Sequence, residues 1–217
     1  MKSDDRVNLV IVEDEKDEAE NIQREFADSK QYRYKSRIVN SPTDYIKFSK
    51  NSDIDACVVD LNFDAQQQGD FLYLGHLIIE TIRFDHPDAL VVVYSGHVGN
   101  PRDPESLRNI VWSIRQGAHD VVPKGRVEEL VERVEFLLRE RENEEARDHE
   151  FRKWLDKVSR SDLRKRFTGP YLACVGNQVL AEGKSRFEAL QKYRVERRER
   201  PDLPITPTIL VLKGGHD

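Results

Sequence analysis

Residues 54–61 read IDACVVDL and residues 89–95 read ALVVVYS, two apolar runs of strand length. Residues 7–12 (VNLVIV) form a third such run, and weaker strand patterns occupy residues 34–39 and 120–122. Helical patterns lie between these strands, over residues 14–27, from Ser41-Pro42 onward, and over residues 71–84 and 105–116. Continuous apolar strands separated by helices are typical of a parallel sheet covered on both faces. We therefore predict an α/β fold with a five-stranded, doubly wound parallel sheet.

A fifth helix follows from about Arg126 and predicts an extended connection to the rest of the chain. Its apolar residues are spaced at three and four positions in two groups, Val127, Leu130, Val134 and Leu137, then Phe151, Leu155 and Val158. Residues 139–150 between the two groups are almost entirely charged. We expect a packed first half, a solvated middle and a second patch that docks on another module or subunit.

The last part of the chain has the pattern of a small α+β domain. Two strand-like segments, 171–175 and 178–181, flank Gly176-Asn177, which is a hairpin signal. Ser185 and Glu188 form a capping box for a helix, and residues 208–213 form a last strand. The predicted organisation is a first domain over residues 1–138, a helical linker over 139–167 and a small ββαβ domain over 168–217.

The composition restricts the class of protein. The chain has 217 residues, of which 38% are hydrophobic and 35% charged, and its net charge is −5. Residues 1–125 carry 15 basic and 22 acidic side chains, whereas residues 151–217 carry 15 and 8. Such an asymmetry favours two modules with different surfaces. The apolar runs are too short to span a membrane, and the N-terminus lacks the pattern of a secretory signal, so we expect a cytoplasmic protein.

Polar residues follow four of the predicted strands at the point where each strand ends. Glu13 and Asp14 follow the first strand, Asp60 the third, Ser95 ends the fourth, and Lys124 follows the fifth. Each of them alone has an ordinary structural explanation, such as a helix cap, a turn or a solvated charge. Because the carboxyl ends of parallel strands lie side by side, however, we expect these residues to converge at one edge of the sheet.

Such a group suits phosphoryl chemistry. Three carboxylates repel one another and need a cation, and oxygen ligands without His or Cys favour a hard ion such as Mg²⁺. A carboxylate beside Mg²⁺ can act as a nucleophile toward phosphorus, while an ammonium group neutralises the transferring phosphoryl oxygens. A neighbouring hydroxyl can sense the attached phosphoryl group.

With these residues in place, the chain resembles the receiver domain of two-component response regulators, which has a flavodoxin-like fold. The matching segments are VIVEDE at 10–15, VVDLNF at 58–63, VVVYSGH at 91–97 and GAHDVVPKG at 117–125, so the resemblance covers residues 7–138. It implies that Asp60 is the phosphoacceptor and that Ser95 and Lys124 contact the phosphoryl group. The implied Mg²⁺ ligands are Glu13, Asp14, Asp60 and the main-chain carbonyl of Asn62. The implied phosphoryl donor is a histidine kinase, a phosphotransfer protein or a small acyl phosphate.

Two positions depart from the pattern of that family. Val121 stands where an aromatic switch residue is usual, three positions before Lys124, and Gly125 replaces the proline that usually follows the lysine. A signal at Asp60 therefore cannot use the usual movement of an aromatic side chain. The small C-terminal domain resembles a prokaryotic domain of unknown function.

We predict a phosphorylation-switched response regulator, not an enzyme beyond its own phosphorylation and dephosphorylation. Its expected output is protein–protein interaction with a downstream partner or self-association as a homodimer. Two alternatives stay open at this point. The first is a receiver-like scaffold that works without phosphorylation, and the second is a nucleic-acid binder that uses the basic residues of the C-terminal region.

Overall fold

The computed structural model describes residues 6–49, 52–62, 72–100 and 102–212. The chain forms two compact units, unit 1 over Met1–Arg139 and unit 2 over Glu140–Asp217, which we describe separately. The three predicted domain ranges stay a prediction. No helix in the described part of the chain combines the length and the apolar character that crossing a bilayer requires.

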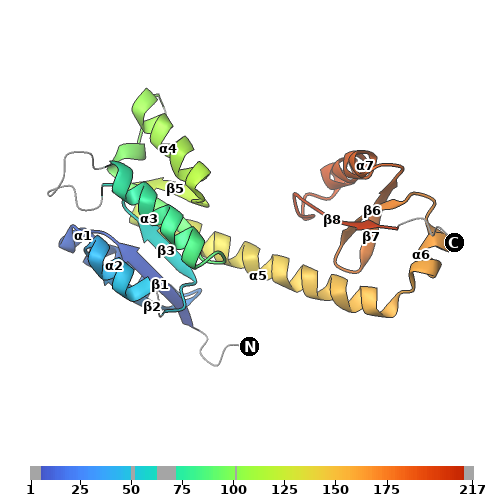
Figure 1. Cartoon of the computed structure of the whole chain (residues 1–217), viewed down its shortest axis with the longest axis horizontal. Coiled ribbons are helices and arrows are strands. Elements are labelled where there is room, and N and C mark those ends of the chain that lie inside the picture. Colours follow the sequence, from blue (N-terminus) through green and yellow to red (C-terminus); the bar gives the residue numbers. More distant parts are fainter. Residues whose placement is uncertain (1–5, 50–51, 63–71, 101, 213–217) are drawn as a thin grey trace. The chain divides into compact units, whose positions relative to one another are not determined.

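Unit 1 is built on a parallel sheet with the strand order β2-β1-β3-β4-β5 (Figure 1). The strands are β1 (Arg6–Val12), β2 (Arg33–Val39), β3 (Ala56–Val59), β4 (Leu90–Ser95) and β5 (Asp120–Pro123). Val12 pairs with Val59, and Val59 pairs with Val93, so the carboxyl ends of the central strands are level with one another. The predicted α/β fold with a five-stranded parallel sheet is confirmed.

Helices cover both faces of this sheet. Those of unit 1 are α1 (Lys16–Ala27), α2 (Pro42–Ser49), α3 (Leu72–Asp85), α4 (Pro104–Gln116) and the first part of α5 (Val127–Lys157). One core cluster joins Phe26 of α1 and Leu130 of α5 to one face of the sheet, and a second joins Tyr45 of α2 and Ile79 of α3 to the other face. Phe71, the predicted start of the third helix, lies outside the described residues.

Helix α4 packs in an unusual orientation. Its buried residues are the polar Ser106, Asn109 and Ser113, whereas Leu107 and Val111 are 49% and 42% exposed. The Asn109 side-chain amide donates to the His97 carbonyl at 3.3 Å, and the Ser113 hydroxyl donates to the Asn109 carbonyl at 2.8 Å. The inner side of α4 is therefore mainly polar, with Ile110 half-buried against the core.

Helix α5 contributes to the cores of both units. Leu130, Val134 and Leu138 are buried in unit 1, and Phe151 is buried in unit 2. Residues 139–150 between them are exposed or half-buried. This agrees with the expected packed first half, solvated middle and second apolar patch, except that Leu138 is more deeply buried than Leu137.

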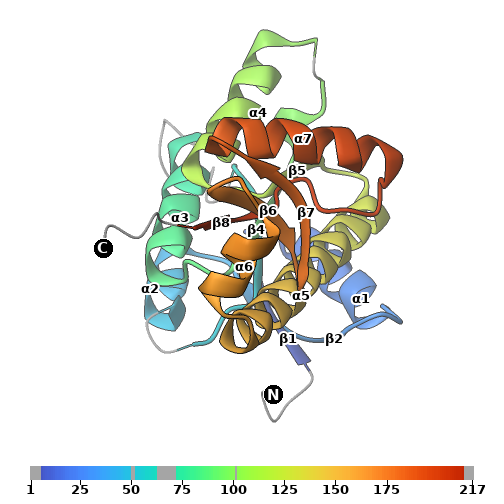
Figure 2. The same ribbon diagram turned by 90° about the vertical axis from the view of Figure 1, so that its right-hand side faces the viewer.

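Unit 2 contains an antiparallel sheet with the order β7-β6-β8. Its elements after α5 are α6 (Arg160–Arg166), β6 (Tyr171–Val175), β7 (Gln178–Gly183), α7 (Arg186–Glu199) and β8 (Thr208–Val211). Figure 2 shows α7 on one side of the strands and α6 with the end of α5 on the other. Lys213, the predicted end of the last strand, lies outside the described residues.

The predicted capping box opens α7. The Glu188 amide donates to the Ser185 hydroxyl oxygen at 3.1 Å, and the Lys184 amide donates to the Glu188 carboxylate at 2.9 Å. Helix α6 lies within the predicted helical linker, but its separation from α5 was not predicted. Its Leu163 is fully buried against Leu172, so residues of the predicted linker complete the core of unit 2.

Candidate functional site at the carboxyl edge of the parallel sheet

The sheet brings the predicted acidic residues to one edge. Glu13 and Asp14 follow β1, and Asp60 follows β3, which is the neighbour of β1. The Asp60 amide donates to the Val12 carbonyl at 3.0 Å, which extends the strand pairing to the site. One carboxylate oxygen from each acid lies within 4.8 Å of those of the other two. Glu13 and Asp60 are buried, and Asp14 is half-buried.

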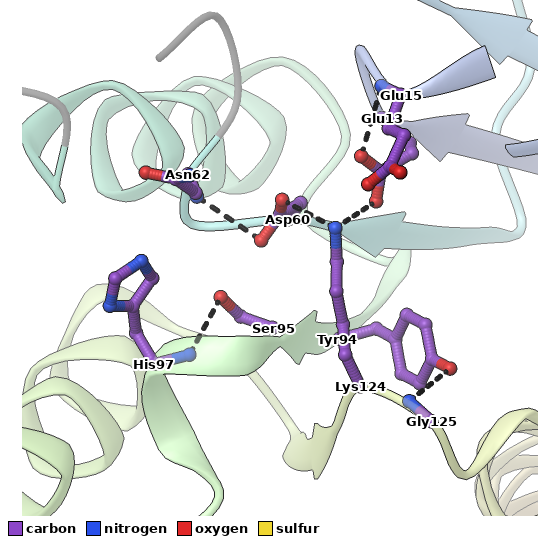
Figure 3. Close-up of polar contacts among 9 residues, drawn as sticks. All are labelled: Glu13, Glu15, Asp60, Asn62, Tyr94, Ser95, His97, Lys124 and Gly125. Atoms are coloured by element: carbon purple, nitrogen blue, oxygen red, sulfur yellow. Dashed lines mark hydrogen bonds and ion pairs between the residues drawn. The ribbon is translucent and has the colours of Figure 1, made fainter. Parts of the chain in front are cut away.

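Lys124 joins two of the three acids. Its Nζ lies 2.8 Å from Glu13 Oε2 and 2.9 Å from Asp60 Oδ2 (Figure 3). The exposed fractions of the side chains are 23% for Lys124, 2% for Glu13 and 3% for Asp60. Coulombic interactions at this distance are much stronger when water is excluded, so the ammonium group is the main local compensation for the two carboxylates.

The burial of the site changes its protonation. Desolvation and the neighbouring Asp60 carboxylate raise the pKa of Glu13 to about 7, although Lys124 opposes this shift. For Lys124, burial disfavours the charged form, but the Asp60 and Glu13 carboxylates outweigh it and raise the pKa of the ammonium group. The cluster therefore has an excess of buried negative charge that a single lysine does not remove.

Main-chain amides bind the remaining carboxylate oxygens. The Asn62 amide donates to Asp60 Oδ1 at 3.1 Å, and the Glu15 amide donates to Glu13 Oε1 at 3.2 Å (Figure 3). These bonds fix the orientation of both carboxylates toward the centre of the site. The predicted role of the Asn62 carbonyl as a metal ligand stays a prediction.

The residues fit a divalent cation. Glu13 Oε2 is buried and accepts no hydrogen bond in the described part of the chain, and its contact is the ion pair with Lys124. All three side chains offer carboxylate oxygens, which hard cations prefer. A cation with two charges at this position would offset the repulsion that raises the pKa of Glu13.

Ser95 lies at the same edge of the sheet. It is fully buried, and its hydroxyl oxygen accepts a hydrogen bond from the His97 amide at 3.4 Å, which caps the short 3-10 turn η1 (Gly96–Val98). Figure 3 shows its side chain pointing into the same space as the Asp60 carboxylate and the His97 ring. The side chain of His97 is exposed.

One contact next to Lys124 was not predicted from the sequence. The Gly125 amide donates to the Tyr94 hydroxyl at 2.9 Å. Gly125 has φ +85°, and the structure has no cis peptide bond among the described residues, so the Lys124–Gly125 peptide is trans. Val121, where an aromatic residue is usual, packs half-buried against the core between the sheet and α3. One signal in the sequence was available, because replacing a proline with Gly125 introduces an amide hydrogen that needs a partner.

Comparison with known proteins adds information on the fold. No protein-family model matches the sequence, and no curated protein has a significantly similar sequence. Solved structures do match, among them a response regulator receiver domain protein (CheY-like) from Methanospirillum hungatei. It is 19% identical, with a TM-score of 0.50, and the match covers 64% of this chain and 98% of that one. Unit 1 has the receiver fold.

Two further matches have TM-scores just below that value. The receiver domain of NtrX from Brucella abortus is 22% identical, with a TM-score of 0.47, over 61% of this chain and 98% of its own. A response regulator from Burkholderia pseudomallei, described with a phosphorylated aspartic acid, a calcium ion and citrate, is 20% identical, with a TM-score of 0.48. That match covers 64% of this chain and 73% of that one. The match with the TM-score of 0.50 confirms the predicted resemblance to receiver domains at the level of the fold, and the rest of the chain is not identified.

Proposed function

We propose that the protein is a response regulator of two-component signal transduction and that Asp60 is its phosphoacceptor. The observation that carries this proposal is the contact of one ammonium group with two buried carboxylates, 2.8 and 2.9 Å away, at the carboxyl edge of a receiver fold. A structural ion pair needs only one acid. Three acids with a single lysine retain negative charge that suits a divalent cation. The cation and the lysine together would then attract the negatively charged phosphoryl group.

The proposed ligands of Mg²⁺ are the carboxylates of Glu13, Asp14 and Asp60 and the main-chain carbonyl of Asn62. When bound, Mg²⁺ would neutralise negative charge on the phosphoryl oxygens. A carboxylate oxygen of Asp60 attacks the phosphorus atom. The new bond between this oxygen and phosphorus forms as the bond between phosphorus and the donor atom breaks. The donor takes the electron pair, as the imidazole of a phosphohistidine or as acetate from acetyl phosphate.

The other residues act on the phosphoryl group after transfer. Lys124 is proposed to exchange its contact with the Asp60 carboxylate for one with a phosphoryl oxygen, since its side chain already reaches the site. The Ser95 hydroxyl is proposed to donate to a second phosphoryl oxygen after releasing the His97 amide, which it holds at a long 3.4 Å. These two movements would couple the phosphorylation of Asp60 to β4 and β5.

The proposed partners are a histidine kinase or a phosphotransfer protein upstream, and a protein surface downstream, which includes a second copy of the chain. We propose no enzymatic activity toward other molecules. A nucleic-acid role of the basic C-terminal region has less support, because Tyr193, one of its available aromatic residues, is fully buried and donates its hydroxyl to the Pro204 carbonyl at 2.6 Å. Such a side chain cannot stack on a base.

The test is the intact mass of the full chain after incubation with Mg²⁺ and acetyl phosphate. We expect one added phosphoryl group, which is absent when EDTA replaces Mg²⁺ and absent from the Asp60→Asn variant. As a matched control, Asp55→Asn removes a carboxylate from the opposite end of β3, where it accepts from the Asn8 amide at 2.9 Å, and should still be phosphorylated. No added mass on the folded wild-type chain, with acetyl phosphate and with a panel of histidine kinases, would favour the scaffold alternative.

A further inference from the structure

The main chain around Lys124 is held by two consecutive residues at the end of β4. The Lys124 amide donates to the Ser95 carbonyl at 3.2 Å, and the Gly125 amide donates to the Tyr94 hydroxyl at 2.9 Å. The first contact continues the pairing of β4 with β5. It joins two main-chain groups, so any residues other than a proline in place of Lys124 could form it. The second depends on a side chain, so it is specific to this sequence.

Tyr94 is a rigid support for this contact. It is 1% exposed and belongs to the core cluster that joins the sheet to α1 and α5, together with Leu130 and Val134. Burial raises the pKa of its hydroxyl to about 12, so the group stays neutral at physiological pH. Because the ring is packed on all sides, the position of the hydroxyl is set by the core rather than by solvent.

Gly125 is suited to receive this support. Its φ of +85° lies in the left-handed region that side chains disfavour, and a Cβ built at this position meets no atom within 4 Å. The conformation, and not a lack of space, therefore requires glycine here. Its amide also needs an acceptor, which a proline at the same position would not.

We propose that Tyr94 is a positioning residue for the phosphoryl chemistry, because its hydroxyl binds the Gly125 amide and thereby fixes the main chain from which the Lys124 ammonium reaches Asp60. This inference rests on the proposed function of Asp60. Lys124 has a long, flexible side chain whose ordering is entropically costly, so a fixed main chain reduces the freedom that it must lose. Without this support, the main chain next to Lys124 keeps only the bond to the Ser95 carbonyl, and the ammonium group is positioned less precisely at the phosphoryl oxygens.

The test compares the rates of phosphorylation of the full-length wild type and the Tyr94→Phe variant. Mg²⁺ is saturating, acetyl phosphate is the donor, and intact mass is followed over time. Phenylalanine keeps the buried ring and removes only the hydroxyl. We expect the maximal rate to fall about 3- to 30-fold, with little change in the concentration of acetyl phosphate that gives half of that rate. A general loss of stability in a chain that stays folded would not lower the maximal rate while leaving the half-saturating concentration of acetyl phosphate unchanged.

The matched control is Tyr34→Phe. Tyr34 packs against the same core cluster, and its hydroxyl has no hydrogen-bond partner among the described residues, so this variant should be phosphorylated at the wild-type rate. A second readout is the hydrogen exchange of the Gly125 amide followed by nuclear magnetic resonance. We expect it to be faster in Tyr94→Phe than in the wild type and unchanged in Tyr34→Phe.

A wild-type rate in a folded Tyr94→Phe variant would overturn the inference and leave the proposed function intact. An unphosphorylated wild-type chain would overturn the proposed function, and the inference with it. If Tyr94→Phe does not fold, a semisynthetic chain with glycolic acid in place of Gly125 replaces the amide by an ester, which removes the amide hydrogen, leaves the core unchanged and still allows the φ of +85°. We expect the same slowing in that variant, and a wild-type rate there would also overturn the inference.

Discussion

Replacing Lys124 by methionine would test the electrostatic account of the site. Methionine has a similar length but no charge, so Glu13 and Asp60 lose the ammonium group that lies 2.8 and 2.9 Å away. Removing one partner of a buried ion pair costs about 3–5 kcal/mol. Because Lys124 is 23% exposed and Glu13 can take up a proton, we expect the lower end, about 3 kcal/mol, in the absence of divalent cations.

The assay is urea denaturation of the full chain at pH 8 with EDTA. The unfolding of unit 1 is followed by the amide hydrogen exchange of β3 and β4, whose residues are buried in its core. The matched control is Lys16→Met, which breaks an ion pair with Glu20 at 3.6 Å on the surface of α1. Exposed pairs of this kind contribute about 0–1 kcal/mol.

The effect of Mg²⁺ on the stability of the variant is a second, independent test. Adding Mg²⁺ should restore much of the stability of Lys124→Met, because a divalent cation can compensate the same carboxylates. The reasoning would be refuted if Lys124→Met and Lys16→Met lowered the free energy of unfolding equally. It would also be refuted if Mg²⁺ stabilised neither the wild type nor Lys124→Met.

Three further predictions address other parts of the structure. The pKa of Glu13 is raised from 4.5 to about 7 in the folded protein, so between these pH values the native state holds a proton that the unfolded state has released. The metal-free protein should therefore lose up to about 3 kcal/mol of stability as pH rises from 4.5 to 7. Denaturation at both pH values should show this loss, and Glu13→Gln should abolish it. Gly75→Ala should lower the free energy of unfolding by about 1–3 kcal/mol and slow phosphorylation, because its Cβ would lie 2.4 Å from the Cα of Leu61, next to Asp60. Gly96→Ala is the control and should have little effect in the same assays, since its Cβ meets nothing within 4 Å. Ser185→Ala removes the cap of α7 and should lower the thermal stability of unit 2 by about 1 kcal/mol, measured by calorimetry, while the rate of phosphorylation stays unchanged.

The sequence predicted those parts of the fold whose pattern is local. The apolar runs of β1, β3 and β4 are buried on both faces, so their strand character is visible without knowledge of their neighbours. The convergence of the acidic residues at one edge of the sheet could be predicted for the same reason, because their places at strand ends follow from the parallel topology.

Other features depend on contacts between distant residues and could not be read from the sequence. The bond between Tyr94 and Gly125 joins positions 31 residues apart, and Tyr94 by its pattern is simply another apolar residue of a buried strand. The separation of the short helix α6 from α5 was not predicted either, because Leu163 is the one fully buried residue among the described side chains of α6, which gives no helical periodicity of its own.

The reversed packing of α4 has a consequence for the way unit 1 opens. A helix that buries Ser106, Asn109 and Ser113 gains little from the hydrophobic effect, while its apolar Leu107 and Val111 stay in contact with water. Its detachment from the sheet therefore has a smaller free-energy cost than that of α1, whose Ile22 and Phe26 are fully buried. In native-state amide exchange, α4 should separate as an early subglobal unfolding unit, well before the sheet and α1.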